Sequence, residues 1–196
     1  MSGPVKTAPR LRNAAQTRAR ILSAAQLAFS SRDYSQAKVS EIAAEAGVNQ
    51  ALVIRYFESK EKLFETALIA AIEQRQSESG VRNDRSRFGE GIAEQMIELE
   101  WSGPNPLAMA VHAASNLQTR AIATTLMSSR IVADLAEWLG EEEAAIRATE
   151  VLAMCAGLFT YRRLLPLDPL QGDLHPDFRR WFVATVQAII DREPEM

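Results

Sequence analysis

Apolar residues recur at three- and four-residue steps along most of the chain, which is the pattern of amphipathic α-helices. The first stripe begins after Pro9. Its members are Ile21, Leu22, Ala25, Ala28 and Phe29. The segment 30–37 has little apolar periodicity and predicts a turn. Because the chain shows neither alternating β-branched runs nor an Asn-Gly hairpin signal, we predict an all-α fold.

A second, compact pattern lies between residues 39 and 57. It opens with a short apolar stripe that a glycine ends: Ile42, Ala43, Ala46 and Gly47. Asn49 then suits the N-cap of a further helix, whose inner face is Val53 and Phe57. This spacing predicts a helix-turn-helix, whose second helix enters the major groove of DNA with its N-terminal residues leading. An ordinary helical corner has the same pattern, so both interpretations stay open on these residues alone.

The rest of the chain predicts further helices. We expect them over about 60–79, from about 88 to 101, from Asn105–Pro106 onward, over about 119–139, over roughly 142–165, and from Pro176 to about Asp191. The polar segment 80–87 predicts a loop. Glu141, Glu142 and Glu143 are expected in the first turn of the helix after Gly140, where negative charge is favourable. The prediction is about nine helices in all.

Composition excludes several other classes. The single cysteine, Cys155, forms no intrachain disulfide, and neither His112 nor His175 has a second His, Cys or Glu at metal-binding spacing. No nucleophile elbow, P-loop or dinucleotide fingerprint occurs, so we expect no catalytic residues, no metal and no cofactor. No apolar run approaches the roughly 18 to 20 residues that span a membrane. The N-terminal residues lack the apolar stretch of a secretory signal, so we expect a cytoplasmic protein without a membrane partner.

Charge is distributed unevenly. Residues 1–64 hold ten Lys and Arg against five Asp and Glu, whereas residues 65–196 hold twelve against twenty. A basic front half suits a polyanion, because neutralising phosphates supplies much of the non-specific affinity for DNA. Basic segments that are merely solvated are also common. Charge and the helix-turn-helix pattern together favour a nucleic-acid partner over either signal alone.

Residues 17–64 resemble the DNA-binding domain of the tetracycline-repressor (TetR) family. The resemblance rests on Arg18, Ile21, Ala24, Ala25, Phe29, Ile42–Ala43, Ala46–Gly47–Val48, Tyr56–Phe57 and Ser59–Lys60–Glu61. It implies an all-α homodimer with a three-helix DNA-binding head and a larger helical body that dimerises and binds a small ligand. We accordingly expect an N-terminal arm and DNA-binding domain over residues 1–59 and a ligand-binding and dimerisation domain over 60–196.

The resemblance also implies which residues meet double-stranded DNA. Arg18, Lys38, Tyr56 and Lys60 are expected to bind phosphates. The candidates for the groove-facing set are Ser40, Asn49, Gln50, Ala51, Leu52 and Arg55. Gln50 could read an adenine edge and Arg55 a guanine or a phosphate. The alternative for Lys60 is a solvated place in the first turn of a helix capped by Ser59.

The chain departs from the family pattern at four positions. Asp33 stands where relatives usually have Gly, and Lys38 stands where they have Ser or Thr, which gives up a side-chain N-cap but adds a positive charge. Leu52 and Ile54 replace polar residues that relatives use. Since neither side chain donates hydrogen bonds, we expect apolar contacts there, such as one to a thymine methyl group.

Two further sets of residues follow from the family's body. The expected dimer interface comprises Val151, Met154, Leu158, Phe178, Trp181, Phe182, Val186 and Ile189. The expected ligand pocket comprises Met96, Leu99, Trp101, Met109, His112, Phe159 and Tyr161. Plain core packing is an alternative for both sets, and His112 could be a satisfied core histidine.

The resulting hypothesis is a ligand-responsive transcriptional regulator, most often a repressor in this family. It would bind a palindromic operator as a homodimer in the bacterial cytoplasm and be released by an unknown small-molecule effector. The main alternative is a helical module that binds a small molecule or a protein without sequence-specific binding to DNA.

Overall fold

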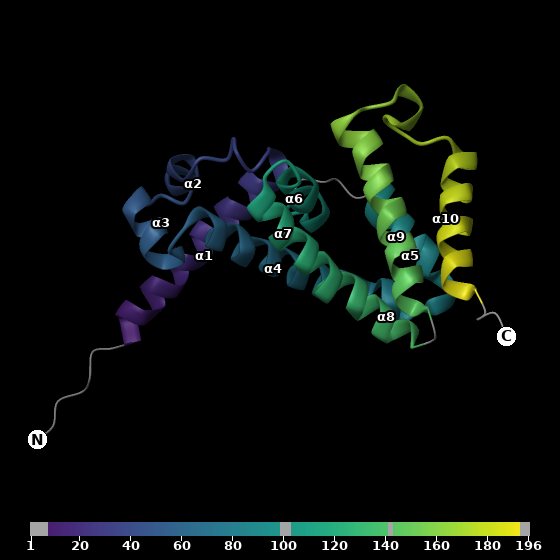
Figure 1. The fold of residues 1–196 in the computed structure, drawn as a ribbon, viewed down its shortest axis with the longest axis horizontal. Coiled ribbons are helices and arrows are strands. Elements are labelled where there is room, and N and C mark those ends of the chain that lie inside the picture. Colours follow the sequence, from purple (N-terminus) through teal and green to yellow (C-terminus); the bar gives the residue numbers. More distant parts are fainter. Residues whose placement is uncertain (1–7, 99–102, 141–142, 193–196) are drawn as a thin grey trace, which may run out of the picture. The chain divides into compact units, whose positions relative to one another are not determined.

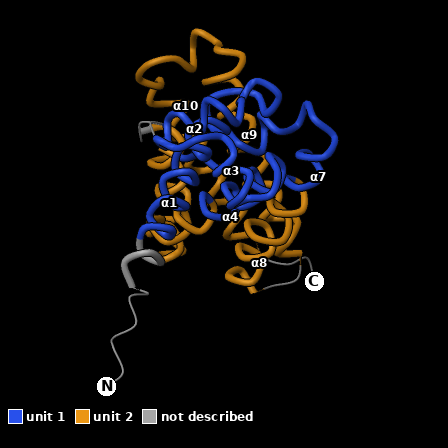
Figure 2. Tube along the Cα trace, turned by 90° about the vertical axis from the view of Figure 1, so that its left-hand side faces the viewer, with its two compact units in different colours: residues 1–71, 104–123 blue, residues 72–103, 124–196 orange. Residues whose placement is uncertain are grey.

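The computed structural model describes residues 8–98, 103–140 and 143–192 of the 196-residue chain. Within these ranges every regular element is a helix or a helical turn, as the apolar periodicity predicts. The chain divides into two compact units, which Figure 2 distinguishes by colour. Unit 1 comprises residues 1–71 and 104–123, and unit 2 comprises residues 72–103 and 124–196.

Unit 1 contains the three-helix head that the sequence predicts. Helix α1 spans Ala8–Ser31, α2 spans Val39–Glu45, α3 spans Gln50–Phe57, and α4 begins at Lys60 and ends, in unit 2, at Glu78. Helix α2 packs against both α1 and α3 (Figure 1). Gly47 adopts φ of +64° between α2 and α3, a left-handed conformation that costs glycine little. Helix α2 therefore ends just before Gly47, as the sequence predicts.

The core of unit 1 is built around three aromatic rings. Phe29 of α1 and Phe64 of α4 meet edge to face at 5.3 Å between centroids, and Tyr34, in the turn after α1, lies within 6 Å of both. The side chains of Ile21, Ile42 and Val53 complete this interior from α1, α2 and α3. Buried aromatic pairs contribute about 0.5–1.5 kcal/mol each beyond their area. The cluster fixes the start of α4 against the head.

Helix α6 (Pro106–Ala113) also belongs to unit 1, although it lies far from α1 in the sequence. Asn105 caps it through a hydrogen bond from Ala108 N, and its own backbone N–H donates to the hydroxyl of Ser30 at 2.9 Å. At the other end, the backbone N–H of Tyr34 donates to the carbonyl of His112. Both ends of α6 are thus held by the C-terminal end of α1 and the turn that follows it.

Unit 2 is made of helices that are extended or joined by helical turns. Helix α5 (Phe88–Ala93) continues into a π turn, α7 (Leu117–Leu126, which begins in unit 1) continues through a π turn into α8 (Ala133–Leu139), and α9 spans Ala144–Phe159. Helix α10 spans Pro176–Asp191 and packs along α5 and α9 (Figure 1). Counting joined segments once, the described ranges contain nine helices, in agreement with the prediction.

A glycine lets α5 and α10 approach closely. A Cβ at Gly89 would come within 2.5 Å of the carbonyl oxygen of Val183, so no other residue fits without a backbone shift. The backbone N–H of Gly89 also donates to the side chain of Gln187 at 2.9 Å. Phe182, Val186 and Ile190 fill the interior beside this contact.

Several predicted boundaries are confirmed and two differ. The Asn105–Pro106 start, the stop at Gly140 and the start at Pro176 all lie where predicted. The expected loop 80–87 instead forms two 3₁₀ turns, η1 (Gly80–Asn83) and η2 (Arg85–Arg87), and Asp84 caps the second by accepting a hydrogen bond from Ser86 N. Glu143 does not stand in the first turn of α9: it is the N-cap residue, with φ of 63°. Glu141 and Glu142 lie outside the described residues.

No helix among the described residues is long and apolar enough to cross a membrane.

The domain boundary predicted after residue 59 separates two expected functions, DNA binding and ligand binding with dimerisation. The boundary between the two compact units is a different one, and it falls inside α4 and α7. The functional division stays a prediction.

Candidate nucleic-acid interface and ligand cavity

The N-terminal half of α3 presents polar side chains to solvent. Asn49 caps the helix by accepting a hydrogen bond from Leu52 N at 2.8 Å, while Val53 and Phe57 are buried on the inner face. On the outer face the structure exposes predicted groove residues: Asn49, Gln50, Ala51 and Arg55. Leu52 is half-buried, and Ile54 is 39% exposed. Burial of the opposite face therefore leaves the predicted reading face free of the unit's own core.

The start of α2 adds a second exposed stretch. Lys38 occupies the N-cap position in an extended conformation without a side-chain cap bond, and Ser40 follows it on the exposed side. The ammonium of Lys38 lies 3.6 Å from Glu41, which also accepts a hydrogen bond from Arg32 at 2.8 Å. These pairs are exposed and weak, so a phosphate can compete for either cation.

Arg18 lies against the end of α3, and Tyr56 belongs to that helix. The guanidinium of Arg18, on the exposed side of α1, lies 5.0 Å from the centroid of the buried Phe57 ring. Stacking on a ring leaves the edge of a guanidinium available to an anion. Tyr56 is half-buried on α3. Both positions are consistent with their predicted role at phosphates.

Lys60 is placed differently from the other predicted phosphate ligands. Its ammonium donates a hydrogen bond to the carbonyl of Tyr34 and lies 4.1 Å from the centroid of the Tyr34 ring. Burial lowers the pKa of Lys60, against the opposing influence of Glu61. Ser59 accepts a hydrogen bond from Lys62 N and so caps α4, as the alternative interpretation of this segment expects. Lys60 thus stabilises the head internally in the DNA-free protein.

Glu61 completes this polar cluster at the start of α4. Its carboxylate accepts hydrogen bonds from its own backbone N–H, from Ser59 and from the phenol of Tyr34, and these contacts lower its pKa. Burial and the neighbouring carboxylate raise the pKa of Tyr34, so the phenol remains a donor. The sequence-based interpretation missed this role of Tyr34, for which the only available signal was an aromatic residue in a polar turn.

The seven predicted pocket residues are not brought together in one unit. Met109, which is fully buried, and His112 belong to unit 1, where Nδ1 of His112 lies 3.4 Å from the carboxylate of Asp33. Met96, Phe159 and Tyr161 belong to unit 2, and Leu99 and Trp101 lie outside the described residues. Met109, Met96 and Phe159 are buried, which both interpretations of these residues expect, so the predicted pocket stays a prediction.

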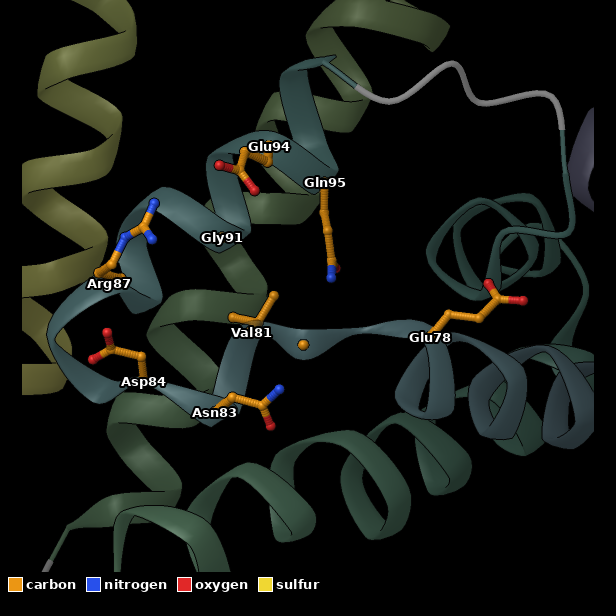
Figure 3. Close-up of a pocket in the computed structure, with 9 residues that line it drawn as sticks. Glu78, Val81, Asn83, Asp84, Arg87, Gly91, Glu94 and Gln95 are labelled. Atoms are coloured by element: carbon orange, nitrogen blue, oxygen red, sulfur yellow. The ribbon is translucent and has the colours of Figure 1, made fainter.

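Unit 2 holds a cavity of about 490 Å³ beside the end of α4 (Figure 3). It is lined by Glu78, Gly80, Val81, Asn83, Asp84, Arg87, Gly91, Glu94 and Gln95. None of the predicted pocket residues is among them. The sequence-based interpretation missed this cavity because its walls come from the polar segment 80–87, which predicts a loop.

The predicted dimer residues divide into two groups. Five of them are buried inside unit 2 itself: Val151, Leu158, Phe182, Val186 and Ile189. Met154 and Phe178 are half-buried, and Trp181 is 55% exposed, with its ring 5.3 Å from that of Phe178. These three border an apolar groove of about 270 Å³ to which Tyr161 and Leu170 also contribute. Leu158 and Phe182 line the same groove from below. The dimer interface itself stays a prediction.

Two further observations concern metal ligands and the single cysteine. The described residues contain no group of three or more His, Cys, Asp or Glu side chains that could hold a metal ion. Burial raises the pKa of the Cys155 thiol to about 12, which keeps it protonated and unreactive.

The fold and its exposed recognition helix define a helix-turn-helix regulator of transcription that binds DNA. The sequence matches two family descriptions: "Bacterial regulatory proteins, tetR family" over residues 21–67, and "Tetracyclin repressor-like, C-terminal domain" over residues 86–190. Since the second match alone covers more than half of the chain, the protein belongs to the TetR family. It is accordingly a regulator and not an enzyme.

Solved structures agree with this assignment. A TetR-family regulator from Streptomyces coelicolor is 25% identical, with a TM-score of 0.53, over 91% of this chain and 96% of that one. A protein from Rhodococcus described as a TetR-family transcriptional regulator has a TM-score of 0.67 at 17% identity, over 90% of this chain and 100% of its own. NalD, the secondary repressor of the MexAB-OprM multidrug efflux pump in Pseudomonas aeruginosa, has a TM-score of 0.57 at 17% identity, over 88% and 95%. At 17% identity the last two show the fold alone. The search of curated proteins gave no match.

Proposed function

We propose that this protein is a ligand-responsive repressor that binds a palindromic operator as a homodimer and leaves it when a small molecule binds. The observation that carries the proposal is the exposed N-terminal half of α3, which Asn49 caps and whose inner face is buried. A capped helix with a polar outer face can enter a major groove without unfolding. Such a role places the protein in the cytoplasm, where the DNA is.

On the DNA, we assign different tasks to different residues. Gln50 and Arg55 are exposed polar side chains on α3, so they are the candidates for reading base edges. Arg18 and Lys38 are exposed cations beside α3 and α2, so they bind phosphates and fix the docking register. Lys60 acts mainly by holding the turn at Tyr34, and it reaches a phosphate only if that contact breaks.

For dimerisation, we propose the groove between α9 and α10. Tyr161 and Trp181 are 45% and 55% exposed there, and the groove is lined by apolar side chains. A two-fold axis through this face would let the same patch cover itself. Two recognition helices must then lie about one helical turn, or 34 Å, apart along the duplex.

The regulatory step requires that the effector bind more tightly to one arrangement of the two heads than to the other. The difference between those two affinities sets how far the DNA affinity falls, commonly about 1–3 kcal/mol in allosteric proteins. NalD, which shares the fold, is itself a repressor, and this supports the direction of control proposed here.

The test is a binding titration against the inverted repeats in the DNA that flanks the coding region. Fluorescence anisotropy with labelled duplexes should show tight binding to one palindrome and weaker, salt-dependent binding to a scrambled duplex. Gln50→Ala should relax the preference between the two duplexes, whereas Lys38→Ala should weaken both alike and reduce the salt slope by about 1. Equal affinity for both duplexes would leave the alternative, a binding module without sequence-specific recognition of DNA.

A further inference from the structure

The cavity in unit 2 has a defined construction. Its walls come from the end of α4, from the turns η1 and η2, and from α5 with the π turn Glu94–Glu98 that continues it. The side chains of Val81 and Gln95 point into its centre (Figure 3). Gly91 allows η1 to pack against α5, because a Cβ there would lie 3.1 Å from the side chain of Val81. The floor is therefore fixed by close packing.

The volume of the cavity suits a small organic molecule. Pockets for such ligands commonly measure about 300–1,000 Å³, and this one measures about 490 Å³. Val81 and the two glycines give the floor an apolar character, while the amides of Asn83 and Gln95 supply both donors and acceptors. A ligand with an apolar body and few polar groups matches these walls.

The charge of the lining residues indicates which class of molecule the cavity binds. The lining holds three carboxylates, Glu78, Asp84 and Glu94, against one guanidinium, that of Arg87. In Figure 3, Arg87 and Asp84 lie on the same side of the cavity and Glu78 on the opposite side. Hydrogen bonds from Ser86 help to lower the pKa of Asp84, so this carboxylate stays ionised. A concave surface with an excess of one charge concentrates ions of the opposite charge.

We propose that this cavity binds an organic cation with an apolar body, and that such a cation is the effector. The proposed binding of the cation is inferred from the cavity alone. Its role as the effector depends on the function proposed above. Each carboxylate attracts the cation across a partly hydrated gap, so each contributes only a small part of the affinity. Several carboxylates around one cavity add their contributions.

The experiment compares two ions of the same shape and opposite charge. Isothermal titration calorimetry of the full-length protein should show saturable binding of tetraphenylphosphonium and at least tenfold weaker binding of tetraphenylborate. Glu78→Gln and Glu94→Gln should each weaken the cation about two- to fivefold, and the double variant should show the product of the two effects. Glu137→Gln is the matched control: it removes the same charge from an exposed position in α8 outside the cavity, and it should change the affinity less than twofold.

Three results would overturn the proposal: similar affinity for the two ions, an equal effect of the control and cavity variants, or no saturable binding of the cation up to 1 mM, a concentration at which about 4 kcal/mol of binding free energy is detectable. Circular dichroism checks that each variant is folded. A parallel titration with DNA separates the two levels of the claim. Cation binding that does not affect operator affinity would retain the binding site and remove its role as the effector site.

Discussion

The phenol of Tyr34 donates a hydrogen bond of 3.0 Å to the carboxylate of Glu61, which connects the turn after α1 to the first turn of α4. The same turn receives the ammonium of Lys60 and holds the C-terminal end of α6 through the carbonyl of His112. Three segments that are distant in the sequence are therefore fixed around one aromatic side chain. The orientation of α4 relative to the helix-turn-helix depends on this cluster.

Removing only the hydroxyl of Tyr34 should destabilise the protein without emptying its core. Tyr34→Phe retains the ring that packs against Phe29 and Phe64, but it leaves Glu61 without this donor. We expect the free energy of unfolding to fall by about 1–2 kcal/mol, as measured by urea denaturation. Tyr161→Phe, at a position 45% exposed, should change it by less than about 0.5 kcal/mol. Equal effects of the two variants would show that the hydrogen bond contributes nothing.

The charge of Glu61 should make this stabilisation depend on pH. Because the folded state lowers the pKa of Glu61, ionised Glu61 stabilises the fold above its unfolded pKa, and this contribution is lost as the pH falls through the folded pKa. Glu61→Gln removes the charge but retains an acceptor for Tyr34. We expect a loss below about 1 kcal/mol at pH 7, because the group is partly exposed. The difference from the unmodified protein should shrink in unfolding curves recorded below the ordinary carboxyl range, and a constant difference down to acid pH would contradict it.

Asn49 allows helix capping to be separated from contact with DNA. Asp and Ser cap helices about as well as Asn, so Asn49→Asp and Asn49→Ser should both leave the melting temperature within a few degrees of the original. The added charge of Asp would lie at the end of α3 that is proposed to enter the groove, beside the phosphates. Anisotropy titrations should therefore show about a tenfold or greater loss of DNA affinity for Asn49→Asp and a much smaller loss for Asn49→Ser. If the two variants bind DNA alike, this end of α3 does not face the duplex.

The helix-turn-helix and several helix boundaries could be predicted because local signals determine where these helices start and end. Asn105 and Pro106, Gly47, and Gly140 act through their own backbone preferences and caps, which do not depend on distant residues. Lys60 could not be placed in this way. Its partner is a backbone carbonyl 26 residues earlier, and nothing in the spacing indicates that a long cationic side chain would turn inward.

Helix α9 shows a second limit of periodicity. Its apolar residues surround most of the helix, but the pattern does not say which side meets α8 and α10 of the same chain and which remains exposed. Val151 and Leu158 prove to be buried internally, while Ile146 is 55% exposed. The cavity was missed for a related reason: polar residues between helices predict a loop, and only packing shows that this loop forms 3₁₀ turns around a space.

Gly89 should tolerate no side chain. In Gly89→Ala, the added methyl group would lie 2.5 Å from the carbonyl oxygen of Val183, and relief requires α5 and α10 to separate. We expect a destabilisation of about 1–3 kcal/mol in urea denaturation, with a visible loss of cooperativity if unit 2 alone unfolds. Gly103→Ala is the control, since a Cβ there meets no atom within 4 Å. A stability equal to that of the control would show that the helices have room to adjust.

Trp181 should decide whether the protein dimerises through the groove of α9 and α10. Its indole is 55% exposed and packs against Phe178, so Trp181→Glu removes a large apolar contact from the proposed interface and adds a charge, while Phe182 stays buried below it. Large aromatic side chains at interfaces commonly contribute about 2 kcal/mol or more, so the dimer dissociation constant should rise at least about thirtyfold in sedimentation equilibrium. Leu117→Glu makes a comparable change at a residue of unit 1 that is 73% exposed, and it should leave the constant unaltered. Operator affinity should fall in parallel for Trp181→Glu alone, since two half-sites need two connected heads. If the dimer persists with Trp181→Glu, the interface lies elsewhere. A two-fold contact through this groove would bury two glutamates against each other, with no positive charge to compensate them.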